Sequence, residues 1–550
     1  MTTPRELAPA RRGAARRLGA VAGVLAAAVA IGVSQLVAGI TGVTGAPVPA
    51  TGSAAIDLAP PALKNFAIST FGSNDKNVLI IGTLVVLTVL AAVTGAAAVR
   101  RLGYGLAGLG ILMAVGLAAA LTRPHAGAAA AVPTLVGAVA GGLVLVRLIR
   151  AVAPAGAPGG AGRPDQAAGE PDVPAGRPPA PVGPGGNDRP PARYPPPGPD
   201  RRRFLINGGV SLAVAGVGVL GGRVLGERAS VSTARSALRF PAPARRAVLP
   251  PGTDLHVSGQ PPFVTPNSDF YRVDTALILP QVSPESWRLR IHGMVAREIE
   301  ISFDELLRRP LIEHYTTLTC VSEPIDGPYI GNARWLGASL PGLLRAARPR
   351  AGADQLLCTS ADGFTSGTPL AVVMDGREAT LTVAMNGTAL PVAHGFPARM
   401  VVPGLYGYVS ATKWVTDIKV TTFAAERAYW AQRGWSQLGP IKTESRIDVP
   451  GGGTIRAGRT PVAGVAWAQH KGIDAVHVRV DRGAWQQARL AAVPGIDTWR
   501  QWVWEWDATP GTHLIEARAT DVTGFTQTAA EVPPEPNGAT GYPSVRVTVR

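Results

Sequence analysis

The chain has 550 residues, of which 46% are hydrophobic and only 16% are charged. Soluble domains carry roughly 25% charged residues, so part of this chain is expected to lie outside water. Two cysteines are too few for a disulfide scaffold. The net charge of +16 is concentrated near apolar segments, since residues 1–150 hold 12 Lys or Arg and 3 Asp or Glu. This placement indicates membrane topology, and without a zinc-ligand cluster, P-loop or basic recognition helix we expect no nucleic-acid partner.

Five uncharged apolar runs each approach the ~20 residues that a helix needs to cross a bilayer. They cover about residues 18–40, 78–99, 102–122, 126–146 and 204–222. Buried helices of a soluble protein are the alternative, but the basic flanks of the runs favour membrane spans. We therefore predict an all-α transmembrane bundle, with four helices in residues 1–150 and a fifth at 204–226. Its alanine and glycine content suits close helix packing.

Arginines flank these runs in a consistent alternating pattern. Under the positive-inside rule they place the N-terminus in the cytoplasm and everything after about residue 223 outside. We therefore expect a multi-pass protein of the cytoplasmic membrane, in contact with lipid, with its second half on the outer face. Arg201-Arg202-Arg203-Phe204-Leu205 also resembles a twin-arginine export signal, for which an ordinary basic flank is the alternative. The flanking arginines are Arg11, Arg12, Arg16, Arg17, Arg100, Arg101, Arg147, Arg150, Arg201, Arg202 and Arg203.

Two further features concern the first half. Residues 151–200 contain 15 Pro and 10 Gly, so we predict that residues 151–203 form a disordered linker. Haem in a helix bundle usually needs histidine as an axial ligand. The only histidine before residue 256 is His125, at a predicted loop, so we expect no haem in the bundle.

From about residue 245 short strands and helices are mixed. Residues 287–293 alternate like a strand, and Ser302 with Glu305 three positions later has the pattern of a helix capping box. Residues 316–322 indicate a strand that runs into Cys320, and residues 385–391 indicate a tight turn. This pattern indicates short strands and turns mixed with short helices.

Residues 436–550 show a period of two that is typical of strands. Val476, Val478 and Val480 alternate with polar residues, and Trp502, Trp504 and Trp506 alternate in the same way. Regular strands separated by turns indicate a β-sandwich. We interpret the tryptophan stripe as core or interface, because that is far commoner than a binding platform.

Several short motifs in the second half occur together. His-Gly-Phe-Pro-Ala-Arg spans residues 394–399, Val-Val-Pro-Gly follows at 401–404 and Lys-Trp at 413–414, with Met-Asn-Gly upstream at 385–387. Over about residues 250–550 this combination resembles the sulfite oxidase family of molybdenum enzymes. The resemblance implies a molybdopterin-binding domain of mixed α+β fold at 245–435 with one Mo-molybdopterin per chain, and no flavin or NAD motif is evident. It also implies an Ig-like β-sandwich at 436–550, a domain that often mediates homodimers in the family.

The resemblance assigns Cys320 as the catalytic metal ligand, and a soft thiolate suits such a metal. Cys358 is interpreted as a core residue; a disulfide between the two cysteines is the alternative, and it would consume the ligand. Arg399 and Lys413 match positions that contact the cofactor, for which a surface salt bridge is the alternative. The implied cofactor-binding residues are Asn267, Phe270, Tyr271, Ser360, His394, Arg399, Tyr408, Val409, Ser410 and Lys413.

The substrate side departs from the family pattern. Glu323 lies in Val-Ser-Glu-Pro where a Gly-Asn-Arg-Arg type run follows the cysteine in sulfite oxidases, and Phe364 stands in place of a tyrosine. Arg272 is displaced by one residue, which in a strand would turn it to the other face. We therefore expect reduction of a small or protein-bound S- or N-oxide by a separate electron carrier. Sulfite oxidation and a non-catalytic outer-face binding module are the alternatives.

Overall fold

The computed structural model describes residues 4–41, 47–60, 75–122, 127–152, 201–228 and 231–550. These residues form two compact units, one within residues 1–228 and one that contains residues 231–550. The predicted linker at 151–203 falls almost entirely on residues 153–200, which lie outside the described residues. Each unit is described by itself below.

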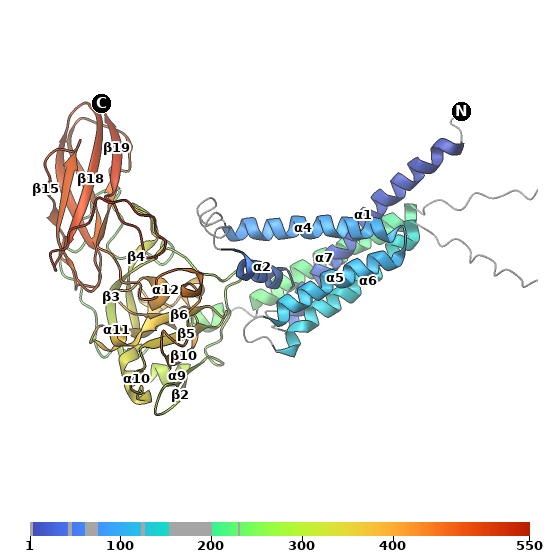
Figure 1. Ribbon diagram of the computed structural model, residues 1–550, viewed down its shortest axis with the longest axis horizontal. Coiled ribbons are helices and arrows are strands. Elements are labelled where there is room, and N and C mark those ends of the chain that lie inside the picture. The colour runs from blue at the N-terminus through green and yellow to red at the C-terminus, as the bar shows by residue number, and fades with distance from the viewer. Residues whose placement is uncertain (1–3, 42–46, 61–74, 123–126, 153–200, 229–230) are drawn as a thin grey trace, which may run out of the picture. The chain divides into compact units, whose positions relative to one another are not determined.

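Long apolar helices make up the first unit (Figure 1). Among the described residues, five helices are long and apolar enough to cross a membrane, which confirms the predicted set. The helix α2, which covers the short stretch Pro47–Leu58, was not predicted. The helices of this unit are α1 (Pro4–Thr41), α2, α4 (Asp75–Ala98), α5 (Leu102–Leu121), α6 (Ala131–Val152) and α7 (Arg201–Arg228).

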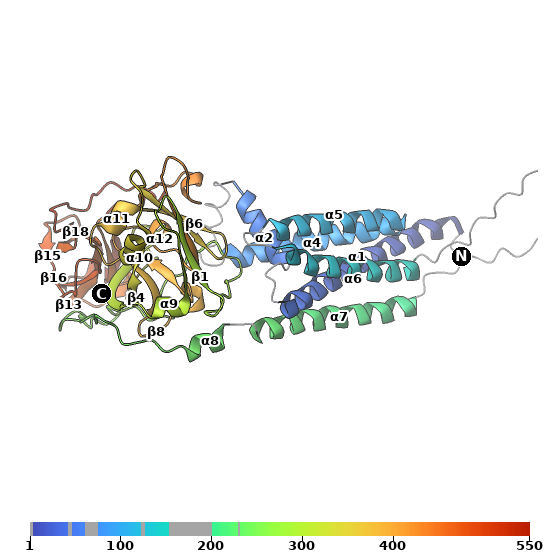
Figure 2. The same ribbon diagram turned by 90° about the horizontal axis from the view of Figure 1, so that it is seen from below.

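Helix α1 contacts α4, α6 and α7, and Figure 2 shows it slanting across the bundle between α4 and α7. The contacts are made through glycine. A Cβ added to Gly218 of α7 would lie 2.5 Å from the carbonyl of Gly32 in α1, and one added to Gly141 of α6 would lie 2.8 Å from the Ala26 carbonyl. Small residues therefore let the helix backbones approach closely, as expected for membrane helices.

Residues 231–550 begin with α8 (Ser232–Ala237), followed by one mixed sheet and one antiparallel sheet. One sheet has the strand order β2-β1-β10-β5-β6, in which β1 and β10 are parallel. The other has the order β3-β4-β7-β8, with β9 paired to β7. Their strands are β1 (Arg288–Gly293), β2 (Ile299–Ser302), β3 (Leu311–Thr319), β4 (Ile330–Ser339), β5 (Gln355–Ser360), β6 (Thr365–Pro369), β7 (Thr380–Met385), β8 (Thr388–Ala389), β9 (Arg399–Val401) and β10 (Val415–Thr421).

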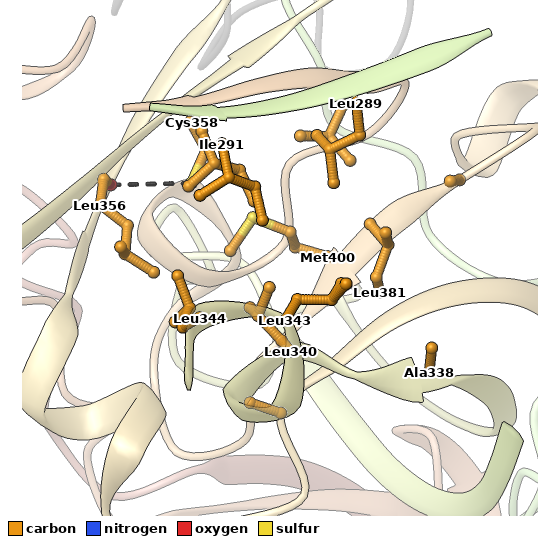
Figure 3. Close-up of a cluster of buried hydrophobic side chains, with 14 of the residues drawn as sticks. Leu289, Ile291, Ala338, Leu340, Leu343, Leu344, Leu356, Cys358, Leu381 and Met400 are labelled. Atoms are coloured by element: carbon orange, nitrogen blue, oxygen red, sulfur yellow. Dashed lines mark hydrogen bonds between the residues drawn. The ribbon is translucent and has the colours of Figure 1, made fainter. Parts of the chain in front are cut away.

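Short helices connect these strands: α9 (Phe303–Leu307), α10 (Leu340–Ala347), α11 (Leu370–Met374) and α12 (Gly407–Ser410). The predicted capping box is present, since Ser302 accepts from the backbone of Glu305 and the Glu305 side chain accepts from the backbone of Ser302. Leu343 and Leu344 of α10 pack with strand residues of both sheets in one apolar core (Figure 3). That core fixes the strands on which the candidate site depends.

Two facing sheets form the end of the chain, and all their strand pairs are antiparallel except the parallel pair β12–β19. The first has the order β11-β13-β17-β16 and the second β12-β19-β18-β14-β15. Alternate residues of both sheets, including Val476, Trp502 and Ile515, meet in one core, which agrees with the predicted sandwich. The strands are β11 (Glu444–Val449), β12 (Gly453–Ile455), β13 (Gly458–Trp467), β14 (Ile473–Val480), β15 (Gln486–Gln487), β16 (Arg489–Leu490), β17 (Arg500–Ala508), β18 (Gly511–Asp521) and β19 (Ser544–Val549). We call these strands and their connecting loops the C-terminal β region.

Candidate active site

Cys320 immediately follows strand β3 and is 8% exposed. Its backbone N–H donates to the Tyr329 carbonyl at 3.0 Å, and the Ser322 N–H lies 3.5 Å from its Sγ. Burial raises the pKa of the Cys320 thiol to about 11, while Lys413 acts in the opposite direction. A buried thiol with a nearby cation can become a thiolate when a metal ion binds to it.

Both cysteines are free thiols, so the disulfide alternative is wrong. Cys358 lies in the middle of β5, is fully buried, and donates from Sγ to the Leu356 carbonyl (Figure 3). It packs with the apolar residues of the core, which confirms its interpretation as a core residue. Cys320 is thus the one thiol that lies outside that core.

A wall of rings lies beside Cys320. Phe270 stacks on Tyr271 with ring centroids 5.3 Å apart, and it meets Trp335 and His394 edge-on at 5.8 and 5.4 Å. A Cβ added to Gly407 would lie 3.7 Å from both Tyr271 Oη and the Thr319 carbonyl. Gly407 therefore lies next to both the Tyr271 hydroxyl and the end of β3. Its pKa is raised well above the usual value, by burial and then by the Cys320 charge.

Two buried cations face this wall. Arg399 is 3% exposed, lies 5.1 Å above the Trp335 ring, and donates to the carbonyls of His394 and Ala411 at 3.1 and 3.2 Å. The Lys413 ammonium pairs with Asp274 at 3.0 Å. Burial lowers the pKa of Arg399 to about 10 and that of Lys413 to about 8. Neither cation is a surface salt bridge, so that alternative is wrong.

Asp274 was missed by the sequence interpretation. Its carboxylate binds Lys413 and also accepts from Arg272 Nε at 2.9 Å, and its side chain is only 6% exposed. No local sequence pattern marks this residue, because its partner Lys413 is 139 positions away in the chain. The Arg272–Asp274–Lys413 group leaves one net positive charge, and buried Arg399 adds another.

His394 ends a short 3-10 turn and is 4% exposed. Among the described residues its Nδ1 has no hydrogen-bond partner. Burial, followed by the charges of Lys413 and Arg399, lowers the pKa of its ring to about 3. The ring is therefore neutral at physiological pH, and its buried Nδ1 needs a partner.

Asn267 is held by the turn that the sequence predicted at residues 385–391. Its side chain donates to the Thr388 hydroxyl at 3.2 Å and accepts from Asn386 at 2.9 Å. Asn386 adopts a left-handed φ of 52°, a conformation that asparagine tolerates better than most residues. The turn thus fixes Asn267, and the His394 ring hydrogen-bonds to the Asn267 backbone.

The remaining predicted residues lie around this group. Ser360 is the last residue of β5 and pairs with Val415. Val415 follows Lys413 by two positions in the chain. Tyr408, Val409 and Ser410 lie in the short helix α12. The Tyr408 hydroxyl donates to the Ser436 carbonyl.

On the substrate side, the structure corrects the prediction for Arg272 and shows the surroundings of Phe364 and Glu323. The segment around Arg272 is not a strand, so the face-reversal argument is wrong, although the arginine does pair with Asp274. The Phe364 ring contacts Tyr429 at 5.7 Å. Glu323 is 2% exposed, its N–H donates to the Cys320 carbonyl, and burial raises its pKa to about 8.

The residues fit an anionic pterin cofactor that carries a metal. Arg399 and Lys413 supply buried positive charge beyond what Asp274 neutralises, and burying a charge without a partner is unfavourable. His394 Nδ1 is a buried polar atom that lacks a partner among the described residues. A bound anion with ring nitrogens would satisfy both needs, and Cys320 would supply the thiolate.

Comparison with known proteins defines the class. Residues 276–430 match the family model described as oxidoreductase molybdopterin binding domain. The chain is 31% identical to the sulfite oxidase of Gallus gallus over 313 residues, 47% of this chain and 67% of the relative. It is 28% identical to the mitochondrial sulfite oxidase of Rattus norvegicus over 299 residues, 45% of this chain and 54% of the relative. The protein therefore carries a molybdopterin-dependent oxidoreductase domain.

The chain belongs to the sulfite oxidase family. It spans two thirds of the chicken relative and about half of the rat relative. Among solved structures, the sulfane dehydrogenase SoxCD from Paracoccus pantotrophus is similar with a TM-score of 0.45 and 23% identity, covering 51% of this chain and 80% of that chain. The five long apolar helices indicate that this family member is a multi-pass membrane protein.

Proposed function

We propose that the protein is a membrane-anchored molybdopterin oxidoreductase that reduces small or protein-bound S- or N-oxides on the outer face of the membrane. The observation that carries the substrate class is the charge balance beside Cys320. Asp274 pairs with both Arg272 and Lys413, and the Arg399 donors point to backbone carbonyls. The net positive charge that remains is assigned to the anionic end of the pterin, so it is not available to a doubly charged anion such as sulfite, and desolvating an ion costs several kcal/mol.

The cofactor-binding residues would each hold a different part of the metal-carrying pterin. Cys320 is the metal ligand, Arg399 and Lys413 hold the anionic end of one pterin per chain, and His394 Nδ1 bonds the ring system. Phe270 and Tyr271 form the wall. Asn267, Ser360 and the backbone of residues 408–410 complete the pocket. The bound metal would supply two-electron oxygen-atom transfer, a reaction that side chains cannot perform alone.

Tyr271 and Glu323 distinguish the substrate side. The Tyr271 hydroxyl keeps its proton because burial raises its pKa, so at the end of β3 it can donate a hydrogen bond to a neutral oxide oxygen. Glu323 lies in the run after the ligand, where sulfite oxidases carry positive charge. Because burial raises its pKa to about 8, this carboxyl is mostly neutral at pH 7 and offers no positive charge to a dianion. Both features favour a neutral S- or N-oxide.

The net reaction needs a partner. An S–O or N–O bond breaks, two electrons come from a separate redox carrier, two protons come from solvent, and the oxygen leaves as water. Haem, flavin and NAD are not part of this proposal. We also propose that the membrane bundle anchors the domain in lipid, that export uses Arg201–Arg203 as a twin-arginine signal, and that two chains pair through the C-terminal β region.

Steady-state kinetics on the detergent-purified, molybdenum-loaded chain tests the substrate class. We expect sulfoxide or N-oxide reduction with a dye donor, and sulfite oxidation at least about tenfold less efficient, since one lost hydrogen bond to a charged group costs roughly 1.5–3 kcal/mol. A sulfite efficiency above ~10⁵ M⁻¹s⁻¹ without oxide reduction would show sulfite oxidation instead. A molybdenum-free protein inactive in both assays would support the binding module.

A further inference from the structure

The strand that leads to Cys320 is held by residues from outside its own sheet. Gln469, which follows β13 in the C-terminal β region, donates from Nε2 to the Thr317 carbonyl at 3.1 Å and to Thr319 Oγ1 at 3.0 Å. Thr317 and Thr319 belong to the last three residues of β3. The Gln469 amide thus bonds to two residues at the end of strand β3, directly before the candidate metal ligand.

A second loop of the C-terminal β region holds the same place. The Trp499 N–H donates to Thr317 Oγ1 at 2.7 Å, and the Thr317 N–H donates to the Asp497 carbonyl at 3.0 Å. The Thr317 hydroxyl itself donates to Asn332 Oδ1 at 3.0 Å. Thr317 therefore uses its N–H, its carbonyl and its hydroxyl in bonds that fix the strand end.

These contacts are sealed from water. Gln469 is 2% exposed, Thr317 is 1% exposed and Thr319 is fully buried. Hydrogen bonds between buried groups are expensive to lose, because neither partner can turn to solvent. The C-terminal β region therefore holds the end of β3 in addition to the pairing of β3 with β4.

The chain after Cys320 is held from the same side. Arg446 of β11 donates to the Gly327 carbonyl at 3.0 Å, and the Ile447 N–H donates to Asp326 Oδ1 at 3.0 Å. Residues on both sides of Cys320 are thus bonded to the C-terminal β region. This arrangement assigns that region a role beyond pairing two chains.

We propose that Gln469 is a positioning residue that holds the Cys320 thiol in the direction needed for metal ligation. This inference rests on the proposed function, in which Cys320 is the ligand. Groups that orient a ligand from outside its direct contacts commonly change metal affinity or activity 10–100-fold when they are removed. Gln469 does so through two bonds to the strand end and touches neither substrate nor cofactor.

The test uses the full chain in detergent, prepared without cofactor, and N-ethylmaleimide as the probe. Only two cysteines exist, and fully buried Cys358 is an internal reference for global opening. We expect Gln469→Ala to raise the alkylation rate of Cys320 about tenfold while Cys358 stays protected. In cofactor-loaded protein the Mo(V) resonance spectrum should shift and the molybdenum content should fall.

Gln501→Ala is the matched control. Gln501 is fully buried in the same region, and it also makes two bonds to the cofactor-domain side, accepting from the Leu255 N–H at 2.7 Å and donating to the Pro261 carbonyl at 2.9 Å. Those bonds do not involve β3. We expect a similar loss of thermal stability in this control, with unchanged Cys320 alkylation and an unchanged Mo(V) spectrum.

The outcomes separate the possibilities. Equal Cys320 alkylation in Gln469→Ala and wild type, or an equal rise in both variants, overturns the positioning role. Gln469→Met keeps a side chain of similar length but has no hydrogen-bond donor, so it should reproduce the alanine result if little alanine variant is recovered. Failure of both Gln469 variants to fold, while Gln501→Ala folds, shows a purely structural role. Wild type without molybdenum refutes the proposed function instead, and the alkylation comparison still stands.

Discussion

Single residues decide whether the pocket can hold an anion. The sequence motifs predicted Cys320, His394, Arg399 and Lys413, and the structure brings all four to one place. Asp274 could not be predicted, because an ion pair between distant residues leaves no local pattern. The net charge of the pocket depends on the Asp274 carboxylate, which was not predicted. The proposed preference for a neutral substrate depends on it as well.

Gly395 gives a residue-scale prediction about the cofactor pocket. It has a φ of 107°, and an added Cβ would lie 3.0 Å from Arg399 Cβ and 3.1 Å from Lys413 Cα. Gly376 has a similar φ of 104° but nothing within 4 Å. Both alanine variants should lose about 1–2 kcal/mol of stability from the left-handed backbone.

Only Gly395→Ala should also displace the two cations, so its molybdenum content should fall by at least about half relative to Gly376→Ala. Thermal denaturation and metal analysis of the two purified variants check this. Equal molybdenum content in both variants would show that the contact at Gly395 does not shape the pocket.

Glu444 gives a prediction about pH. It is 7% exposed, and burial, with the nearby Glu323 carboxyl, raises its pKa to about 8. A carboxyl with a raised pKa keeps its proton in the folded state, so its contribution to stability is greatest below its ordinary pKa of 4.5 and is lost as pH rises through about 8. Glu444→Gln should therefore raise the melting temperature at pH 8 by about 2–6 °C, and by less at pH 5.

The control for this experiment is Glu505→Gln, whose side chain is 49% exposed beside Arg459. Exposed pairs contribute about 0–1 kcal/mol, so this variant should behave like wild type at both pH values. Melting curves of cofactor-free protein provide the measurement. A stabilisation by Glu444→Gln that is equally large at pH 5 contradicts the assigned pH effect.

At the scale of elements, long periodic patterns were sufficient and short irregular ones were not. The five apolar runs predicted five helices, and alternation predicted β1, β14, β17 and β18, because burial of one face imposes those periods. Helix α2 was missed, since its 12 residues are too few for a span. Residues 407–410 form a helical turn, α12, whose conformation comes from tertiary contacts such as the bond from Thr368 to the Val409 carbonyl.

The helix bundle gives an element-scale prediction. Gly218 of α7 is buried against Gly32 of α1, whereas Gly216, two residues earlier, has nothing within 4 Å. Gly218→Val should force α1 and α7 apart, because small residues at the contact permit their close packing. We expect a lower yield of folded protein and a lower melting temperature in detergent.

Gly216→Val makes the same chemical change on the exposed side of α7 and should leave both quantities near the wild-type values. Size-exclusion profiles and melting curves of the two variants give the comparison. The packing of α1 against α7 would be wrong if the two valine variants were indistinguishable.

At the scale of the whole molecule, the chain combines an apolar helical unit with a unit that carries a molybdopterin-binding domain and two facing sheets. Hydrophobic runs and alternation predicted the helical unit and the two sheets, because burial imposes those periods, while the molybdopterin-binding domain was implied by the resemblance of its motifs to the sulfite oxidase family. These patterns could not predict that the C-terminal β region bonds to both sides of Cys320, since contacts between regions depend on the folded surface. A domain that resembles a pairing module therefore also supports the candidate active site.

The most direct test of the account is the molybdenum content of the full chain, purified from the membranes of a host that supplies the cofactor, together with its Mo(V) resonance spectrum. We predict one molybdenum per chain in the wild type, and a Cys320→Ser variant that loses the thiolate signature and all turnover. Cys358→Ala should keep both. A wild-type protein without molybdenum, or a spectrum that Cys320→Ser leaves unchanged, would contradict the assignment of Cys320 as the metal ligand.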